Sequence, residues 1–323
     1  MSAIRRREFL GVAGALAAWP ASVIHAQAPK HARVGLLTPG PAAFPSLMAA
    51  MRQLGWVEGR NLAVVARAAE GQVARLPGLA ADLASQRVDV VVALSTEAGE
   101  QARSATRTIP IVMLFALDPV KAGLAQSVAR PGGNVTGVMW ADPGFTPKSF
   151  QVFKQAVPGI KRLGVLYAPS TGIESYIDAA KAVARDLGLT LVYLKVTHIS
   201  QVPEALATAK RERVDALRAS TTGFLRPAMD QILDFARSAR IPVSANDSFW
   251  VEQGALLSYI PSGSQIAALG AQMVDRILRG ATPSDMPFQY PTKYELTINL
   301  KTAKALGLTI PQSVLLQADR VIE

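Results

Sequence analysis

Paired hydroxyl side chains recur at corresponding places in two halves of the sequence. Ser95-Thr96 follows a valine-rich run and precedes a predicted helix, and Ser220-Thr221 occupies the same place in the second half. The start of a helix offers free backbone N–H groups and a partial positive charge, which together suit a carboxylate. The same pair can also be a plain helix cap. Because the pair occurs twice, we keep a binding role open beside the capping role.

Two aspartates, Asp118 and Asp247, also occupy similar places, one in each half. A carboxylate at a cleft could pair with the ammonium group of a ligand, since a buried cation needs a partner. Both residues can instead be helix caps, and Asp118-Pro119 is typical of a cap. Our hypothesis is that Ser95 and Thr96 hold a ligand carboxylate while Asp247 faces the amino group of the ligand.

Aromatic rings and further hydroxyls complete the candidate site. Phe44 and Phe249 could supply an apolar wall, although single aromatic residues more often belong to a core. In open parallel sheets, ligands bind beyond the carboxyl ends of the strands. The predicted ligand-binding residues are therefore Phe44, Ser95, Thr96, Asp118, Ser170, Thr171, Thr221, Thr222, Asp247 and Phe249.

Arg218 is an unusual residue because it lies within a predicted strand. It could bind a ligand carboxylate, emerge at the edge of a sheet, or pair with an aspartate. We favour the last two interpretations.

Catalysis and metal binding find little support in the sequence. The chain has no cysteine, which excludes disulfides, thiolate catalysis and cysteine-bound metal. Its three histidines are scattered, and it contains no nucleophile elbow and no phosphate-binding loop. We expect no enzymatic activity, no cofactor and no metal.

The sequence elements that must position these side chains occur twice, once in each half of the chain. Arg33-Val34-Gly35 matches Arg162-Leu163-Gly164, and Arg87-Val88-Asp89 matches Arg213-Val214-Asp215. The repeat is far longer than the about 20–50 residues of solenoid repeats, so it implies two similar lobes. Apolar runs alternate with helical patterns in each half, which favours an α/β fold with two doubly wound parallel-sheet lobes.

The C-terminal segment that follows the second half can complete both lobes only if the chain crosses between the lobes. The expected crossings lie near Trp140–Thr146, Tyr259–Ser262 and Pro287–Thr292, which gives a three-strand hinge. The predicted organisation is an export signal at 1–28, a first lobe of 29–140 plus 261–287, and a second lobe of 141–260 plus 288–323.

The N-terminus reads as an export signal. Arg5-Arg6-Arg7 precedes an uncharged stretch and small residues around Ala26 and Ala28. Arg6-Arg7-x-Phe-Leu resembles the twin-arginine signal, and an ordinary secretory signal is the alternative. The formal charge of +10 comes from scattered basic residues, which is typical of a basic surface and does not favour nucleic-acid binding.

Four stretches of the chain resemble a known family. They are 129–138 (ARPGGNVTGV), 160–170 (IKRLGVLYAPS), 241–261 and 290–323. The chain resembles the ABC-transporter solute-binding proteins whose characterised members bind tryptophan or tyrosine, with a type I periplasmic-binding-protein fold. The resemblance covers essentially the whole mature chain. The sequence departs from the family pattern at Arg218, where a neutral residue is usual, and in the loop that follows it.

The resemblance implies a soluble, monomeric periplasmic protein. It would capture a small polar ligand, an amino acid or related carboxylate that can be aromatic, and deliver it to an ABC permease in the inner membrane. The alternative is a periplasmic sensor subunit that presents ligand to a membrane receptor. The sequence does not identify the ligand.

Overall fold

The computed structural model describes residues 31–41, 44–169, 171–219 and 225–323. The predicted export signal, Ser170, Thr221 and Thr222 lie outside these ranges. Residues 31–323 form one compact unit. Within the described ranges, no helix is both long and apolar enough to span a membrane.

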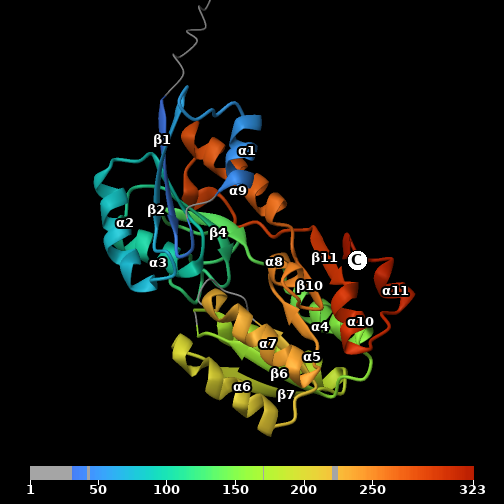
Figure 1. Cartoon of the computed structure of the whole chain (residues 1–323). Helices are drawn as coiled ribbons and strands as arrows, with labels where there is room; N and C mark the ends of the chain where they lie inside the picture. Colours follow the sequence, from blue (N-terminus) through green and yellow to red (C-terminus); the bar gives the residue numbers. More distant parts are fainter. Residues whose placement is uncertain (1–30, 42–43, 170, 220–224) are drawn as a thin grey trace, which may run out of the picture. The chain divides into compact units, whose positions relative to one another are not determined.

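The first sheet has five parallel strands in the order β2-β1-β3-β4-β5. We call this sheet and the helices packed on it the first lobe (Figure 1). Its strands are β1 (Ala32–Thr38), β2 (Leu62–Ala68), β3 (Val90–Ala93), β4 (Ile111–Ala116) and β5 (Val135–Met139), and its helices are α1 (Pro45–Gln53), α2 (Leu76–Ser85), α3 (Thr96–Ala105) and α9 (Gly263–Leu278).

Strand β3 shows why this sheet carries helices on both faces. Val90 and Val92 pack into the core beneath α1 and α9, whereas Val91 and Ala93 pack into the core beneath α2 and α3. Alternate side chains of a strand point to opposite faces, so a continuous valine run is buried on both sides. The strand predicted from this run is confirmed, and α9 reaches the first lobe from a distant part of the chain (Figure 1).

The second sheet has seven strands in the order β12-β11-β10-β9-β8-β6-β7. We call it, with its helices, the second lobe. Its strands are β6 (Arg162–Tyr167), β7 (Thr190–Lys195), β8 (Ala216–Ala219), β9 (Val243–Ala245), β10 (Leu257–Pro261), β11 (Tyr294–Asn299) and β12 (Arg320–Ile322), and its helices are α4 (Phe145–Ala156), α5 (Ile173–Asp186), α6 (Val202–Arg211), α7 (Met229–Ala239), α8 (Ser248–Glu252), α10 (Leu300–Leu306) and α11 (Gln312–Leu315).

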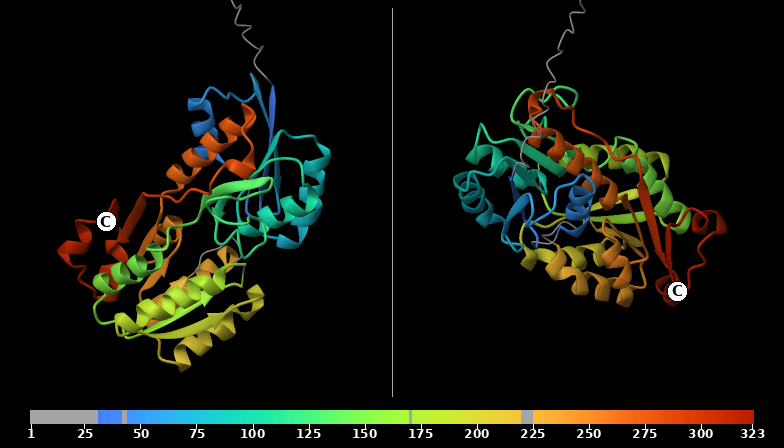
Figure 2. Two further views of the ribbon diagram at one scale, coloured as in Figure 1. Left: turned by 180° about the vertical axis from the view of Figure 1, so that it is seen from behind. Right: turned by 90° about the horizontal axis from the view of Figure 1, so that it is seen from above.

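One strand pair of the second sheet departs from the parallel arrangement. Strand β11 runs antiparallel to β10, while the other pairs of this sheet are parallel. The C-terminal strand β12, which the sequence did not predict, pairs with β11. Helices α4 and α5 share a core on one face of this sheet, and α6 and α7 share the core on the other face (Figure 2).

The sequence repeat has a structural counterpart. The Asp89 carboxylate accepts a hydrogen bond from the backbone N–H of Arg33 at 2.7 Å, and Asp215 accepts one from Arg162 at 3.0 Å. Arg87 and Arg213, two residues before these aspartates, both have positive φ values, of 51° and 53°. Each lobe therefore joins a helix to the next strand by the same kind of turn, with an aspartate at the equivalent position.

Three segments connect the lobes, as the sequence predicted. The first follows β5, the second lies between β10 and α9, and the third precedes β11. Backbone hydrogen bonds join Met139 to Gln289 and Ser262 to Lys293, so the third segment is tied to the other two. Such a connection permits hinge motion while restraining sliding. The lobe boundaries proposed from the sequence stay a prediction.

Aromatic rings and one carboxylate reinforce these connections. The Phe145 ring stacks on Tyr259 at 6.0 Å and on Tyr294 at 5.6 Å. The Tyr294 hydroxyl accepts a hydrogen bond from the backbone N–H of Asp142 and donates one to the Asp142 carboxylate. Burial, followed by this side-chain hydrogen bond, raises the pKa of Tyr294.

The helix predicted to begin at Asp118-Pro119 is absent. The segment after β4 makes a single turn over residues 119–123, where Leu124 and Ala125 donate their backbone N–H groups to the Pro119 carbonyl. Gly123 then takes a φ of 66°, a left-handed conformation that ends the turn. The prediction of a helix here is wrong because this glycine interrupts it.

Candidate functional site

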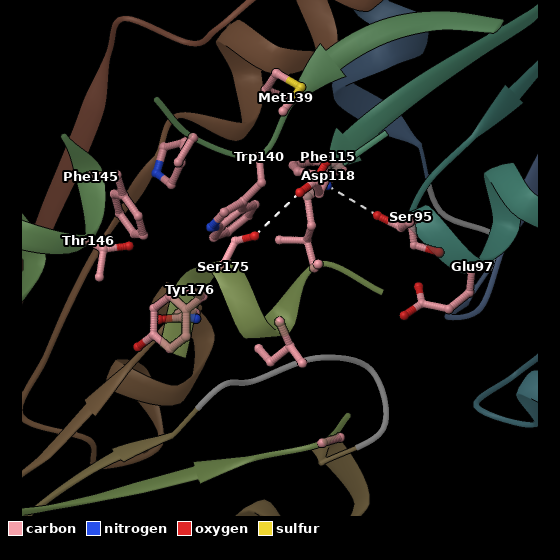
Figure 3. Close-up of a pocket in the computed structure, with 18 of the residues that line it drawn as sticks. Ser95, Glu97, Phe115, Asp118, Met139, Trp140, Phe145, Thr146, Ser175 and Tyr176 are labelled. Atoms are coloured by element: carbon pink, nitrogen blue, oxygen red, sulfur yellow. Dashed lines mark hydrogen bonds between the residues drawn. The ribbon is translucent and has the colours of Figure 1, made fainter. Parts of the chain in front are cut away.

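A cavity of about 1110 Å³ lies at the carboxyl ends of strands from both sheets (Figure 3). The loops after β3, β4, β6 and β9 contribute Ser95, Asp118, Ala168 and Asn246 to its lining. Ligands of open α/β sheets bind at this edge because the loops there can vary while the strands hold them in place. The volume is slightly larger than the about 300–1,000 Å³ of typical small-molecule sites.

Three aromatic residues form one wall of the cavity. Phe115, Trp140 and Phe145 all line it, with ring centroids 5.9 Å apart for Phe115 and Trp140 and 6.2 Å apart for Trp140 and Phe145. This wall, which we call the aromatic wall, offers ring faces and edges to an apolar or aromatic group.

An irregularity in β4 shapes the aromatic wall. The pairing of β4 with β5 shifts between Met113 and Ala116, and Phe115 there takes a φ of 62°. Left-handed backbone is rare and strained for a bulky residue, and such residues cluster at functional sites. At this irregularity the Phe115 ring lies against Trp140, at the end of the strand (Figure 3).

Ser95 and Thr96 lie at the cavity but already have structural partners. The Ser95 hydroxyl caps α3 by accepting the backbone N–H of Ala98 at 3.0 Å. The Thr96 hydroxyl accepts the N–H of Leu117 at 3.1 Å, and Thr96 is only 1% exposed. The predicted helix start is therefore confirmed. The carboxylate of Glu97 lines the cavity beside it and opposes a ligand carboxylate at this end.

Asp118 lines the cavity and caps the turn that replaces the predicted helix. Its carboxylate accepts the N–H of Lys121 at 3.0 Å and contacts the Ser175 hydroxyl at 3.4 Å (Figure 3). Lys121 Nζ also donates to Ser175, at 3.1 Å.

Asp247 lines the cavity as the N-cap of α8. Its carboxylate accepts the N–H of Phe249 at 2.9 Å and lies 3.5 Å from the guanidinium of Arg226. The two ion-pair side chains are 31% and 50% exposed, so water screens the pair strongly. Asp247 therefore combines a capping role with a place where a ligand could reach it.

The other predicted residues do not line this cavity. Thr171 donates a hydrogen bond to Glu100 at 2.7 Å and borders a smaller neighbouring hollow. Phe44 packs against the core beneath α1, and Phe249 packs against the core beneath α7, with the Arg226 guanidinium 4.3 Å above its ring. Ser170, Thr221 and Thr222 lie outside the described residues.

Arg218 is buried in the interior of the second sheet, which is not where the sequence analysis expected it. Its strand β8 lies between β6 and β9, and the residue is 2% exposed. Among the described residues, no carboxylate lies within 4.0 Å of its guanidinium. The interpretations of a sheet edge and of an aspartate pair are therefore wrong. Arg218 instead donates hydrogen bonds to Tyr176 and Asn246, which both line the cavity.

Several lining residues escaped the sequence analysis: Glu97, Phe115, Trp140, Phe145, Tyr176 and Asn246. Trp140 and Phe145 belong to a crossing segment, whose sequence predicted a hinge and carried no signal for ligand binding. Asn246 precedes a predicted residue by one position, so the strand-end rule could have found it. Tyr176 lies one turn inside α5, where that rule does not reach. Within the described ranges, no group of three or more acidic or histidine side chains is placed to hold a metal ion.

Comparisons with known proteins agree with this architecture. The chain is 26% identical over 260 residues to a tyrosine-binding protein of Clostridioides difficile, covering 80% of this chain and 74% of that protein. Its structure is similar to the ABC domain from Streptococcus pneumoniae in complex with L-Trp, with a TM-score of 0.84 and 25% identity over 91% of this chain and 100% of that one. It is also similar to a conserved domain protein of Vibrio cholerae, with a TM-score of 0.83 and 29% identity over 90% of this chain and 100% of that one.

These relatives share two lobes and a type I periplasmic-binding fold, which is the fold predicted from the sequence. A family model described as ABC transporter substrate binding protein matches residues 42–322. That family consists of solute-binding proteins and not enzymes, as expected. With this match over most of its length, the chain belongs to the ABC transporter substrate-binding protein family.

Proposed function

We propose that this chain captures an amino acid or related carboxylate, aromatic ones included, in the cavity between its lobes. The observation that carries the proposal is the aromatic wall of Phe115, Trp140 and Phe145 in a cavity that polar side chains also line. A site that is mostly apolar with a few placed polar groups is typical of small-molecule binding. The tyrosine-binding and L-Trp-bound relatives support this ligand class.

Four predicted residues that line the cavity remain in the proposed site: Ser95, Thr96, Asp118 and Asp247. Asp247 is the proposed partner of the amino group, because only one edge of its carboxylate is occupied by the α8 cap and the Arg226 pair is partly exposed. Ser95 and Thr96 would form part of the cavity wall at the start of α3, because both hydroxyls already have partners.

The proposed cellular role is delivery of this ligand to an ABC permease from the periplasm, as a monomer. Arg6 and Arg7 in the predicted export signal support export, and family membership supports the transporter. The three connecting segments support closure of the lobes around the ligand, since a ligand that binds one state better shifts the protein to that state.

A thermal-shift screen of the purified mature chain tests the ligand class. The screen would contain the common amino acids, aromatic carboxylates, and sugars as a contrasting class. We expect L-tryptophan, L-tyrosine or another amino acid or carboxylate to raise the melting temperature in a concentration-dependent way. Stabilisation by sugars alone would contradict the proposed ligand class.

A further inference from the structure

Arg218 is a buried cation that no described carboxylate balances. It lies in an interior strand, is 2% exposed, and packs with its guanidinium 5.1 Å from the ring centre of Phe150. Isolated buried charge is costly, so buried cations are normally paired with anions. Residues 220–224, which lie outside the described ranges, have the sequence Ser-Thr-Thr-Gly-Phe and contain no acidic side chain.

Four neutral oxygen atoms receive the hydrogen bonds of this guanidinium. Nε donates to the Tyr176 hydroxyl at 2.7 Å and Nη1 donates to the Ser244 hydroxyl at 3.2 Å. Nη2 donates to the Ser149 hydroxyl at 3.1 Å and to Asn246 Oδ1 at 3.3 Å. The guanidinium is thus held firmly in place, and its positive charge remains uncompensated by any of these partners.

Two of the four hydrogen-bond partners connect the Arg218 guanidinium to the cavity. Tyr176 and Asn246 both line the cavity, and neither is fully buried. Because the Tyr176 oxygen accepts from Arg218, its O–H hydrogen remains free to donate elsewhere. Because Asn246 turns its oxygen toward Arg218, its NH₂ group points to the opposite side of the planar amide. Arg218 therefore leaves one hydrogen-bond donor available on each of two cavity-lining residues, with a positive charge behind them.

We propose that this wall binds the carboxylate of the ligand, with Tyr176 and Asn246 donating hydrogen bonds and Arg218 balancing the charge from behind. The inference deepens the proposed function and rests on it. Arg218 is a positioning residue here, because it acts through its two partners. Hydrogen bonds from such donors to an anion are stronger than those to a neutral group.

The placement of neighbouring charges supports this assignment. Asp247, the proposed partner of the amino group, directly follows Asn246 along the chain. An α-amino acid carries its ammonium and carboxylate groups on one carbon, so the second lobe can hold both. The side chain of the ligand is then left for the aromatic wall.

The start of α3 is the less suitable place for the carboxylate. Ser95 and Glu97 lie at one end of the cavity and Tyr176 at the other (Figure 3). The Ser95 hydroxyl is occupied by its capping bond, and the Glu97 carboxylate would repel a second one. The inferred site thus differs from the carboxylate position expected from the sequence.

Matched pairs of ligands test the inference on the full mature chain. The probes are L-tryptophan, L-tyrosine and L-phenylalanine, each compared with its carboxamide, in which a neutral amide replaces the carboxylate. We expect the wild type to bind the acid at least about tenfold more tightly than the amide, as hydrogen bonds to a charged group imply.

Two variants separate this role from a purely structural one. Tyr176→Phe removes the donated hydrogen bond while keeping the ring, and should lower the preference for the acid severalfold. Asn246→Asp places a carboxylate beside Arg218, and should abolish the preference while raising the melting temperature of the ligand-free protein. Arg218→Met should also abolish the preference, and Arg218→Lys, which keeps the charge, should restore part of it.

Arg237→Met is the matched control. Arg237 lies on α7 of the same lobe, is 68% exposed and pairs with Asp234, so the variant loses the same charge away from the cavity. Its preference for the acid should equal that of the wild type. Equal binding of acids and amides by the wild type would overturn the inference and leave the solute-binding role intact. An unchanged preference in both Tyr176→Phe and Asn246→Asp would also overturn it. If none of these three acids and amides binds, the inference fails for aromatic amino acids, and the thermal-shift screen decides the wider ligand class.

Discussion

The Nε of Arg218 lies 2.7 Å from the hydroxyl oxygen of Tyr176, which lines the cavity. This hydrogen bond links a charge buried in the second sheet to the place where a ligand would bind. The second lobe therefore has a polar end whose donors are fixed, and the hinge side of the cavity has an aromatic wall. An aromatic amino acid likewise has a polar end, which carries its charged groups, and an aromatic end.

Trp140 should contribute to the affinity for aromatic ligands. Trp140→Ala removes a ring that contacts both Phe115 and Phe145, and should weaken L-tryptophan binding about 2- to 12-fold, in line with about 0.5–1.5 kcal/mol for an aromatic contact. Trp140→Phe keeps a ring and should retain most of the affinity. Titration calorimetry measures both variants. Equal losses for alanine and phenylalanine would show that the ring face is not what the ligand uses.

Asp247 can be tested for its capping and charge roles separately. Asp247→Ala should weaken amino-acid binding by about 30-fold or more if the lobes close over the ligand, because losing one member of a charge pair that the closed cavity buries costs about 2–5 kcal/mol. It should also lower the stability by about 1 kcal/mol, since the α8 cap is lost. Asp247→Asn keeps a capping side chain, so its melting temperature should match the wild type while its affinity recovers only in part.

The control for this prediction is Asp234→Asn, which removes an exposed carboxylate on the same lobe. This variant should change neither the affinity for amino acids nor the melting temperature appreciably. If Asp247→Asn binds amino acids as the wild type does, Asp247 is a helix cap alone.

Tyr294 should give the hinge a dependence on alkaline pH. Burial raises its pKa above the usual value of 10.0, helped by the hydrogen bond to Asp142. A raised pKa in the folded state means that the folded protein holds this proton more strongly. Its contribution to stability is therefore complete below about pH 10 and is lost as the pH rises further.

Tyr294→Phe removes both the titrating group and its hydrogen bond. The variant should lose about 1 kcal/mol of stability at neutral pH. Its melting temperature should then fall less steeply than that of the wild type between about pH 10 and pH 11, since one titrating group is gone. Tyr193→Phe is a comparison, because burial also raises the pKa of Tyr193 in a strand away from the hinge. Parallel wild-type and Tyr294→Phe curves would contradict the role assigned to this proton.

The export route rests on Arg6 and Arg7. Replacing both by lysine should block export if the twin-arginine pathway is used, because that pathway reads the arginine pair and not charge alone. Fractionation of cells that express each form measures this. Normal export of the lysine variant would exclude the twin-arginine route and leave a periplasmic location possible by the ordinary secretory route.

The sequence predicted the fold well because its signals were local and repeated. The valine run before Ser95, the paired Arg-Val-Asp turns and the three crossing segments all have counterparts in the structure. The helix after Asp118 failed because capping chemistry at its start does not reveal the left-handed glycine that ends the turn. The antiparallel direction of strand β11 also escaped, since strand direction depends on tertiary pairing.

The candidate site was predictable only in part. The strand-end rule found Ser95, Asp118 and Asp247, whose positions follow from the alternation of strands and helices. It missed Trp140 and Tyr176, which enter the cavity from a crossing segment and from inside a helix. Arg218 was noticed but misplaced, because a single sequence does not show whether a strand lies at the edge of a sheet or in its interior.

Calorimetric titration of the wild type with the best ligand from the thermal-shift screen, repeated with Trp140→Ala, tests the central claim most directly. The account predicts saturable binding of an amino acid or carboxylate at one site per chain, weakened by the substitution in the aromatic wall. Absence of saturable binding for every amino acid and carboxylate, or binding that Trp140→Ala leaves unchanged, would contradict it.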